Sequence, residues 1–198
     1  MAVAPSTADR ILDTSLGVFC RYGFQKTSMQ NIAAAAGISR AAVYLHFANK
    51  EEVFRAGSLR AHTAALDAVD AALGSPADIF AGVQAALTAY FDGLMSEIAA
   101  SPHGPELFDA NRELIGDVVR HTRAALLDRL TLALDAADAR GEIALAGADI
   151  SGAQLATLLV ATAEGLKHDP LAGVSLAEGI GMQLRALRVG IAASRAAA

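Results

Sequence analysis

The chain has 198 residues and a net charge of −5, with 54% hydrophobic but only 5% aromatic residues. This length allows one large domain or two small ones, each with a core of useful size. Ala and Leu are abundant and favour helices, because Ala loses no side-chain entropy and Leu loses little. Alternating runs of Val, Ile and Thr, which are typical of strands, are missing. The composition therefore predicts an all-α fold.

Several classes of protein are disfavoured at once. The single cysteine, Cys20, cannot form an internal disulfide, and its mid-helix position suits a small hydrophobe better than a redox sensor. No Cys/His cluster has zinc spacing, so we expect no metal and no other cofactor. The N-terminus lacks the pattern of a signal peptide, and the longest apolar run is far shorter than the roughly 20 residues of a membrane span. We therefore expect a cytoplasmic protein with no membrane partner.

The charge is unevenly distributed. Residues 1–60 carry seven basic and four acidic side chains, a net charge of +3, whereas the remainder carries nine basic and seventeen acidic side chains, a net charge of −8. A basic head on an acidic body would turn the head toward phosphate. The excess of three is modest and supports nucleic-acid binding only weakly.

Helix starts and stops are easily recognised. Capping boxes are predicted at Thr27, Ser151 and Ser175, and Pro76 suits a first helical position after Ser75. Glycines stand where helices should end. We predict about nine helices, at Thr7–Tyr22, Ser28–Ala36, Arg40–Phe47, Lys50–Leu73, Pro76–Ala100, Pro105–Leu114, Ile115–Arg140, Ser151–Lys167 and Leu176–Ala193.

Residues 28–47 predict a helix-turn-helix. Gly37 can adopt the left-handed conformation that the turn needs, Ser39 caps the second helix, and Ile38 and Val43 are spaced as a hydrophobic staple. Two helices joined by such a turn match the motif that places its second helix in the major groove. A helical hairpin without a DNA role has the same local pattern, so the turn alone leaves both possibilities open.

The outward face of the second helix has the chemistry of base recognition. It carries Ser39, Arg40, Ala41, Tyr44 and His46. Arg40 can pair with guanine and Ala41 can touch a thymine methyl group, while Tyr44 can reach a phosphate.

Phosphate contacts are also expected at two neighbouring helix starts. Thr27 and Ser28 offer hydroxyls and free amides at the start of the first helix of the motif. Lys50 adds an ammonium at the start of the long helix that follows it.

The same region resembles the N-terminal domain of TetR-family regulators, over about residues 8–56 without a gap. The resemblance rests on the following segments: Ile11-Leu12-Asp13 through Phe19, Tyr22-Gly23-Phe24, Thr27-Ser28-Met29-Gln30-Asn31-Ile32-Ala33, Ala36-Gly37-Ile38-Ser39, and Tyr44-Leu45-His46-Phe47-Ala48-Asn49-Lys50-Glu51. The segment Pro102-His103-Gly104-Pro105-Glu106-Leu107 is also similar to one seen in some members. The rest of the chain matches only in layout.

The resemblance implies a homodimer that binds a palindromic operator on double-stranded DNA and usually represses until a small molecule releases it. It implies a DNA-binding domain at residues 1–50 and an effector-binding and dimerisation domain at residues 51–198. By position, the residues that match the family's DNA-facing set are Ser28, Gln30, Ser39, Arg40, Ala41, Tyr44, His46 and Lys50. Arg40 is the only charged side chain among those of the recognition helix.

The remaining helices suggest a cavity. Apolar residues recur at helical spacing along 76–100 and 115–140, which is typical of an ordinary core but also of a mostly apolar ligand pocket. With few polar groups near this stripe, an apolar or weakly polar effector is favoured over a charged one. The candidate lining residues are Thr88, Tyr90, Phe91, Met95, Phe108, Asn111, His121 and Thr122.

The last two helices are more apolar than one core face requires. The helix over 151–167 is apolar around most of its circumference, and that over 176–193 has a continuous apolar seam. We interpret them as an isologous four-helix dimer contact, as the resemblance also implies. The candidate interface residues are Leu155, Leu158, Leu159, Leu184, Leu187 and Ile191.

Two alternatives remain. An all-helical enzyme would need His103 with Glu106 or His121 as acid/base or metal-binding groups, but no third ligand and no catalytic triad or phosphate loop accompanies them. A constitutive DNA-binding regulator without a ligand would share the helix-turn-helix and lack only the pocket. The sequence therefore favours a ligand-responsive regulator that is not an enzyme.

Overall fold

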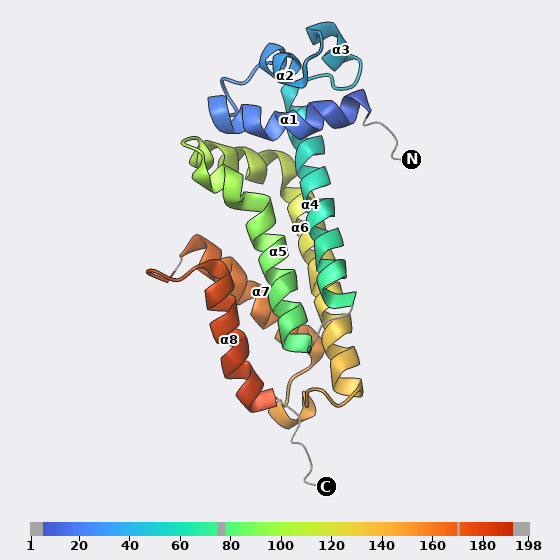
Figure 1. Cartoon of the computed structure of the whole chain (residues 1–198), viewed down its shortest axis with the longest axis vertical. Helices are drawn as coiled ribbons and strands as arrows, with labels where there is room; N and C mark the ends of the chain where they lie inside the picture. The colour runs from blue at the N-terminus through green and yellow to red at the C-terminus, as the bar shows by residue number, and fades with distance from the viewer. Residues whose placement is uncertain (1–5, 75–77, 170, 192–198) are drawn as a thin grey trace. The chain divides into compact units, whose positions relative to one another are not determined.

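The computed structural model describes residues 6–74, 78–169 and 171–191, without the side chains of 93–97, 99 and 168. Over these residues the chain is all-helical, as the composition predicts, and the helices are drawn in Figure 1. Their bounds are α1 Thr7–Tyr22, α2 Met29–Ala36, α3 Arg40–Tyr44, α4 Lys50–Gly74, α5 Ile79–Ala100, α6 Gly104–Ala139, the short 3₁₀-helix η1 Ala146–Ala148, α7 Gly152–His168 and α8 Leu176–Ile191.

Serine caps begin several helices. Ser151 with Gln154 forms the predicted capping box of α7, and Ser175 exchanges the same bonds with Glu178 before α8. The box predicted at Thr27 is wrong by one residue: Ser28 caps α2, and Asn31 completes the box. The reason is that the Thr27 side chain is buried and its hydroxyl donates to the Gly23 carbonyl at 2.6 Å instead.

The predicted division of residues 105–140 into two helices is present as a kink. The element α6 consists of two helical segments that meet at Ile115 (φ −131°, ψ 16°), the position where the sequence predicted a new helix. Ile115 is fully buried in the core. With these two segments counted as one element, the described part has eight α-helices, and the predicted cap at Ser75 and Pro76 lies outside the described residues.

The chain forms two compact units, and neither is one continuous stretch of sequence. The first unit comprises Met1–Thr63 and Met95–Arg120, and the second comprises Ala64–Leu94 and His121–Ala198. Helices α4, α5 and α6 each contribute a segment to both units. The chain therefore crosses from one unit to the other inside helices rather than in loops.

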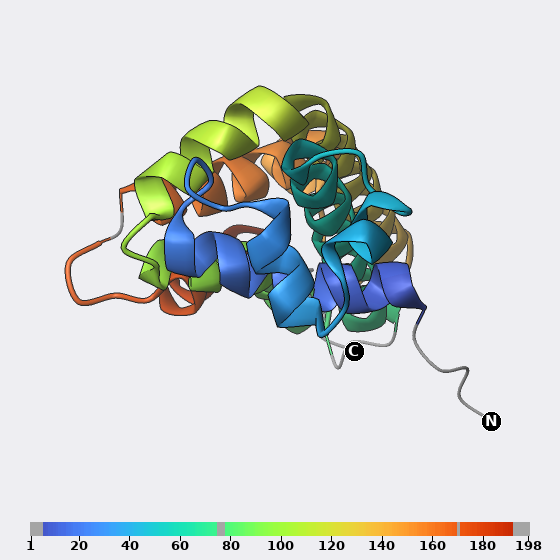
Figure 2. The same ribbon diagram turned by 90° about the horizontal axis from the view of Figure 1, so that it is seen from above.

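The first unit is built around an aromatic centre. Phe19 of α1 stacks on Phe24 at 5.7 Å between ring centroids, and Phe54 of α4 meets both rings edge-on at 5.1 and 5.3 Å. Leu107 and Ile115 of α6 belong to the same buried cluster. Figure 1 shows helices α1 to α3 in blue and light blue, and Figure 2 shows them from above. This core fixes the helix-turn-helix on α1 and α4.

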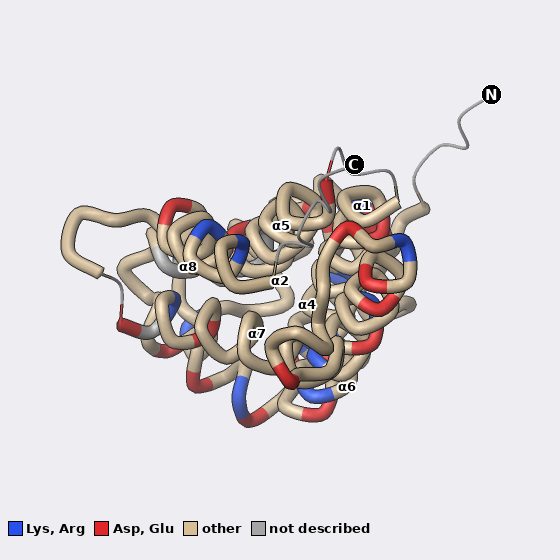
Figure 3. The backbone as a smooth tube through the Cα atoms, turned by 90° about the horizontal axis from the view of Figure 1, so that it is seen from below, with Lys and Arg blue, Asp and Glu red and all other residues tan. Residues whose placement is uncertain are grey.

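The core of the second unit is mostly aliphatic. Leu126 and Leu130 of α6 and Leu155 and Leu159 of α7 are almost fully buried, and Ile180 of α8 joins them. Acidic and basic positions are interspersed along α6 in Figure 3, whereas α7 carries no charged residue between Gly152 and Ala163. Over their described residues, none of the helices is long and apolar enough to cross a membrane.

Candidate nucleic-acid interface

The predicted turn between the two helices of the motif is present. Gly37 is left-handed (φ 65°, ψ 36°), and the amides of Gly37 and Ile38 donate back to carbonyls of the last turn of α2. Arg10 of α1 adds a bond from its guanidinium to the Ala36 carbonyl at 2.8 Å, at the negative end of the α2 dipole. No local sequence signal pointed to this role of Arg10, because its partner is 26 residues away.

The recognition helix is shorter than predicted. It ends at Tyr44 rather than Phe47, because the amides of both His46 and Phe47 donate to the Val43 carbonyl, the first of them in a tighter 3₁₀-type bond. Val43 is fully buried and holds this short helix on the core. Ser39 caps its start by accepting a bond from the Ala42 amide at 3.1 Å.

The predicted base-reading residues are on the surface. Ser39, Arg40, Ala41, Tyr44 and His46 are all exposed. The Arg40 guanidinium lies 5.5 Å from the centre of the Tyr44 ring and donates to the Tyr44 hydroxyl at 3.2 Å. This face can therefore present three kinds of group to DNA: a guanidinium held by the Tyr44 ring, the methyl group of Ala41, and hydroxyls.

An apolar side chain that the sequence reasoning missed lies on the same segment. Leu45 is 83% exposed, next to Tyr44 at the end of α3. The sequence could have indicated this exposure, because Leu45 falls outside the inward face of the helix, which contains Val43 and Phe47. An exposed leucine at this place adds a second apolar group, besides Ala41, that can meet a thymine methyl group.

The start of α2 is exposed and capped, because the Ser28 amide and hydroxyl both donate to Asn31 Oδ1, at 3.0 and 2.5 Å. Ser28 and Gln30 are exposed, as their predicted contact with DNA requires. Thr27, predicted to reach phosphate, is only 3% exposed, and its hydroxyl is engaged with Gly23. Thr27 therefore supports the loop before α2 from inside.

Lys50 is held inside the first unit. Its ammonium donates to the carbonyls of Phe24 at 2.7 Å and Gln25 at 2.9 Å, and it lies 4.7 Å from the centre of the Phe24 ring. An ammonium has three protons, so two of them bind the α1–α2 loop and one remains for another acceptor. The predicted phosphate anchor is thus also a cross-link between the α4 N-terminus and this loop.

The end of α1 and the α1–α2 loop are also bound by the α5–α6 corner, residues 101–106. Ser101 donates from its hydroxyl to the Cys20 carbonyl at 2.7 Å, and the Gln25 amide donates to a Glu106 carboxylate oxygen at 2.6 Å. The His103 ring nitrogen Nδ1 lies 3.7 Å from the other oxygen of Glu106. Glu106, one of the residues considered for an enzyme site, is therefore engaged with the loop, and no cluster of three metal-binding side chains occurs among the described residues.

The predicted pocket residues fall in both units. In the second unit Tyr90 and Phe91 are buried edge-to-face at 5.1 Å, and the Tyr90 hydroxyl donates to the buried Thr122 hydroxyl at 3.2 Å. Burial raises the pKa of the Tyr90 phenol above its ordinary value, so this group is neutral.

The other predicted pocket residues are placed less consistently. The hydroxyl oxygen of Thr88 is buried without a hydrogen-bond partner, whereas His121 is exposed. Phe108 and Asn111 belong to the first unit, and the Met95 side chain lies outside the described residues.

Most of the predicted interface residues lie in the core of their own subunit. Leu155, Leu159, Leu184 and Ile191 are at most 4% exposed, and Leu187 is partly buried against the same cluster. Only Leu158, at 56% exposed, points away from the core. The apolar seam of α8 packs against the core of its own chain. The spacing of its residues does not tell whether such a seam contacts the same chain or a partner.

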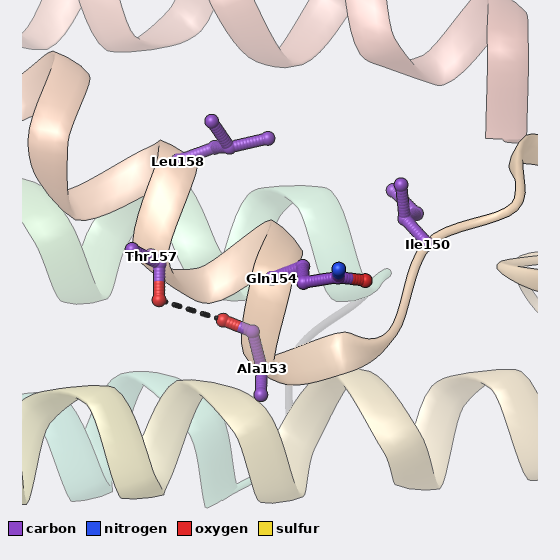
Figure 4. Close-up of a pocket in the computed structure, with 5 residues that line it drawn as sticks. All are labelled: Ile150, Ala153, Gln154, Thr157 and Leu158. Atoms are coloured by element: carbon purple, nitrogen blue, oxygen red, sulfur yellow. Dashed lines mark hydrogen bonds between the residues drawn. The ribbon is translucent and has the colours of Figure 1, made fainter.

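The outward face of α7 is nevertheless largely apolar, and that of α8 carries apolar residues beside the exposed charges of Glu178, Arg185 and Arg188. On α7 a groove of about 470 Å³ is lined by Ile150, Ala153, Gln154, Thr157 and Leu158, as Figure 4 shows. On α8 Met182 is 49% exposed and Val189 is 90% exposed. These exposed residues, and not the buried leucines, form the surface that is free to meet another molecule.

Comparison with known proteins agrees with this architecture. The family model described as "Bacterial regulatory proteins, tetR family" matches residues 11–56. The HTH-type transcriptional regulator AcrR of Shigella flexneri is 43% identical over 51 residues, which are 26% of this chain and 24% of that protein. The match thus spans about a quarter of the length of this curated relative.

Solved structures resemble the chain over nearly its whole length. SmeT, the repressor of the Stenotrophomonas maltophilia multidrug efflux pump SmeDEF, superposes with a TM-score of 0.68 at 22% identity, covering 96% of this chain and 92% of SmeT. A complex of SmeT with triclosan gives a TM-score of 0.67 at 21% identity, covering 96% of this chain and 93% of SmeT. At this identity the likeness shows the fold.

Proposed function

Because the chain belongs to the TetR family, we propose that it is a sequence-specific DNA-binding transcriptional regulator and not an enzyme. The observation that carries the proposal is the exposed face of α3, where Ser39, Arg40, Ala41 and Tyr44 stand on a helix fixed from below by Val43. A short helix that is rigidly seated and exposed on one side can enter the major groove.

Base and phosphate contacts divide between two kinds of groups. Arg40 supplies a bidentate donor for guanine, while Ala41 and Leu45 supply apolar contacts for thymine. Phosphate is expected at the N-terminal end of α2, where the Ser28 hydroxyl would exchange its bond to Asn31 for one to phosphate, and at the Tyr44 hydroxyl. The third proton of the Lys50 ammonium is also available. The first set gives sequence preference, and the second gives affinity that falls with salt.

The test is a selection of genomic fragments by the purified protein, followed by binding measurements on the enriched duplex. An enriched palindrome is expected, with steep salt dependence. Arg40→Ala should cost about 1–3 kcal/mol and relax the preference at one base pair of each half-site. Arg21→Ala, an exposed arginine of α1 outside the recognition face, is the matched control. Enrichment of no common sequence would overturn the proposal.

The palindrome implies a homodimer. We propose that the exposed faces of α7 and α8 meet their copies across a twofold axis, because these faces carry the exposed apolar residues Leu158, Met182 and Val189. The groove on α7 would receive side chains of the second copy. Two heads must lie about 34–36 Å apart to enter successive major grooves, so dimerisation is required for the proposed operator.

We propose further that a small, largely apolar effector releases the protein from its operator. Two observations support this: the core of the second unit is largely apolar around the buried hydroxyl pair of Tyr90 and Thr122, and the structural relative SmeT is known in complex with triclosan.

Linkage provides the test of the effector. An effector that weakens operator binding must itself bind more weakly, by the same factor, when operator DNA is present. Thr122→Phe should block this response with little change in DNA affinity. If a bound ligand has equal affinity with and without operator, the alternative, a constitutive regulator, is correct.

A further inference from the structure

The α5–α6 corner carries a motif that DNA binding, as proposed above, does not use. Within Pro102-His103-Gly104-Pro105-Glu106-Leu107, Leu107 is fully buried in the core of the first unit and anchors the start of α6. Two tight turns precede it, in which the amides of Ser101 and Gly104 donate three residues back. The corner is therefore rigidly built, and it places the Glu106 side chain next to the α1–α2 loop.

Glu106 binds the loop through a backbone amide. The Gln25 N–H donates to Glu106 Oε1 at 2.6 Å, and hydrogen bonds to a carboxylate are stronger than those between neutral groups. The loop is shaped for this contact at Gly23, which has a positive φ of 78°. A Cβ atom at Gly23 would collide with the Glu106 carboxylate and lie 3.1 Å from His103 Nδ1. The close approach thus depends on glycine.

The same loop determines where α2 starts. Lys50 holds the carbonyls of Phe24 and Gln25 from the α4 side, and the Thr27 hydroxyl holds the Gly23 carbonyl. Ser28, the cap of α2, follows directly. If the Gln25 contact were lost, one of the bonds that fix the loop before the phosphate-binding end of α2 would be lost with it.

We propose that Glu106 is a positioning residue for operator binding, which it supports by holding the α1–α2 loop through the Gln25 amide without touching DNA. This inference rests on the proposed function. The contact lies within one compact unit, and its two partners are 81 residues apart in the chain. Neither the length nor the charge pattern of the α5–α6 corner pointed to such a contact.

The charge and the hydrogen bond of Glu106 have opposite effects on DNA binding. A carboxylate repels phosphate, so removing its charge alone should leave affinity unchanged or raise it slightly, most at low salt. Removing the acceptor frees the loop and should lower affinity. Glu106→Gln removes the charge but keeps an oxygen that can accept from Gln25, whereas Glu106→Ala removes both.

The experiment compares these two variants on the operator selected with the wild-type protein. We expect Glu106→Ala to weaken binding about tenfold and Glu106→Gln to stay within about twofold of the wild type or to bind slightly more tightly. Glu113→Ala and Glu113→Gln, in an exposed carboxylate that lines the same cavity as Glu106, are the matched controls and should behave alike. Equal affinity of Glu106→Ala and Glu106→Gln would overturn the proposal.

Hydrogen exchange gives a readout that needs no DNA. The Gln25 amide should exchange faster in Glu106→Ala than in the wild type, with unchanged protection in the buried part of α1 around Phe19. Should the wild type select no operator, the proposed function fails, while the exchange of Gln25 still reports on the contact. If Glu106→Ala does not fold, Glu106→Asp, which keeps the charge but shortens the side chain that reaches the Gln25 amide, provides a milder variant. Unchanged exchange of the Gln25 amide in the folded variant would refute the contact itself.

Discussion

The double role of Lys50 can be resolved by replacing it with methionine, which keeps an unbranched apolar stem and removes the ammonium. The ammonium makes two hydrogen bonds, to the Phe24 and Gln25 carbonyls, and lies over the Phe24 ring. Hydrogen bonds from charged donors contribute about 1.5–3 kcal/mol each, and the site is only partly buried, so the lower end applies. We therefore expect Lys50→Met to lower the free energy of unfolding by about 2–4 kcal/mol.

Two measurements on the same variant separate the two roles. Urea unfolding followed by helical circular dichroism gives the stability, and the slope of log affinity against log salt counts the phosphate contacts. If Lys50 acts mainly as a cross-link, stability falls and the salt slope changes little. A phosphate contact would instead reduce the slope by about 0.9 for each subunit.

The control is Lys26→Met, which removes an exposed lysine of the same loop and should leave stability unchanged. It corrects for the loss of one positive charge from the head. Wild-type stability of Lys50→Met together with a reduced salt slope would refute the cross-link.

Three further outcomes follow from burial and charge. Leu158→Asp should give a folded monomer, measured by light scattering, and a folded dimer of this variant would contradict the proposed interface. Leu184→Asp puts a charge into the core, so circular dichroism should show that the second unit unfolds. Phe19→Ala should cost about 3–5 kcal/mol in urea unfolding, because it empties the aromatic centre of the first unit. Arg55 holds the pKa of Asp117 well below its ordinary value, so this pair stabilises the fold above about pH 4 and the contribution is lost as the pH falls. Asp117→Asn should accordingly lose less stability than the wild type between about pH 5 and pH 3 in thermal unfolding, and an equal loss would show that the pair is not coupled to folding.

Local signals predicted the local structure well. The left-handed Gly37, the Ser39 cap and the buried Val43 were expected, since each depends on residues within one or two turns. The kink at Ile115, where the two helical segments of α6 meet, also coincides with a predicted helix start.

Contacts between distant segments could not be predicted in this way. The sequence shows that Thr27 is polar and precedes a helix, but its burial depends on where the Gly23 carbonyl lies. The apolar surface of α7 was recognised, yet spacing does not say that Leu155 and Leu159 face the core while Leu158 faces outward. Periodicity tells which side chains avoid water, and the tertiary fold decides which neighbour covers them.

The interleaving of the two units in the sequence has a consequence for anyone who recombines such proteins. Leu107, Ile115 and Val118 complete the core around Phe19 and Phe54, although they lie far beyond the helix-turn-helix. A fragment ending near residue 63 would expose that core face to water. A chimaera that takes the helix-turn-helix from this chain should therefore also take residues 95–120. Without them, the transplanted recognition helix would pack on core residues from another protein that do not match it.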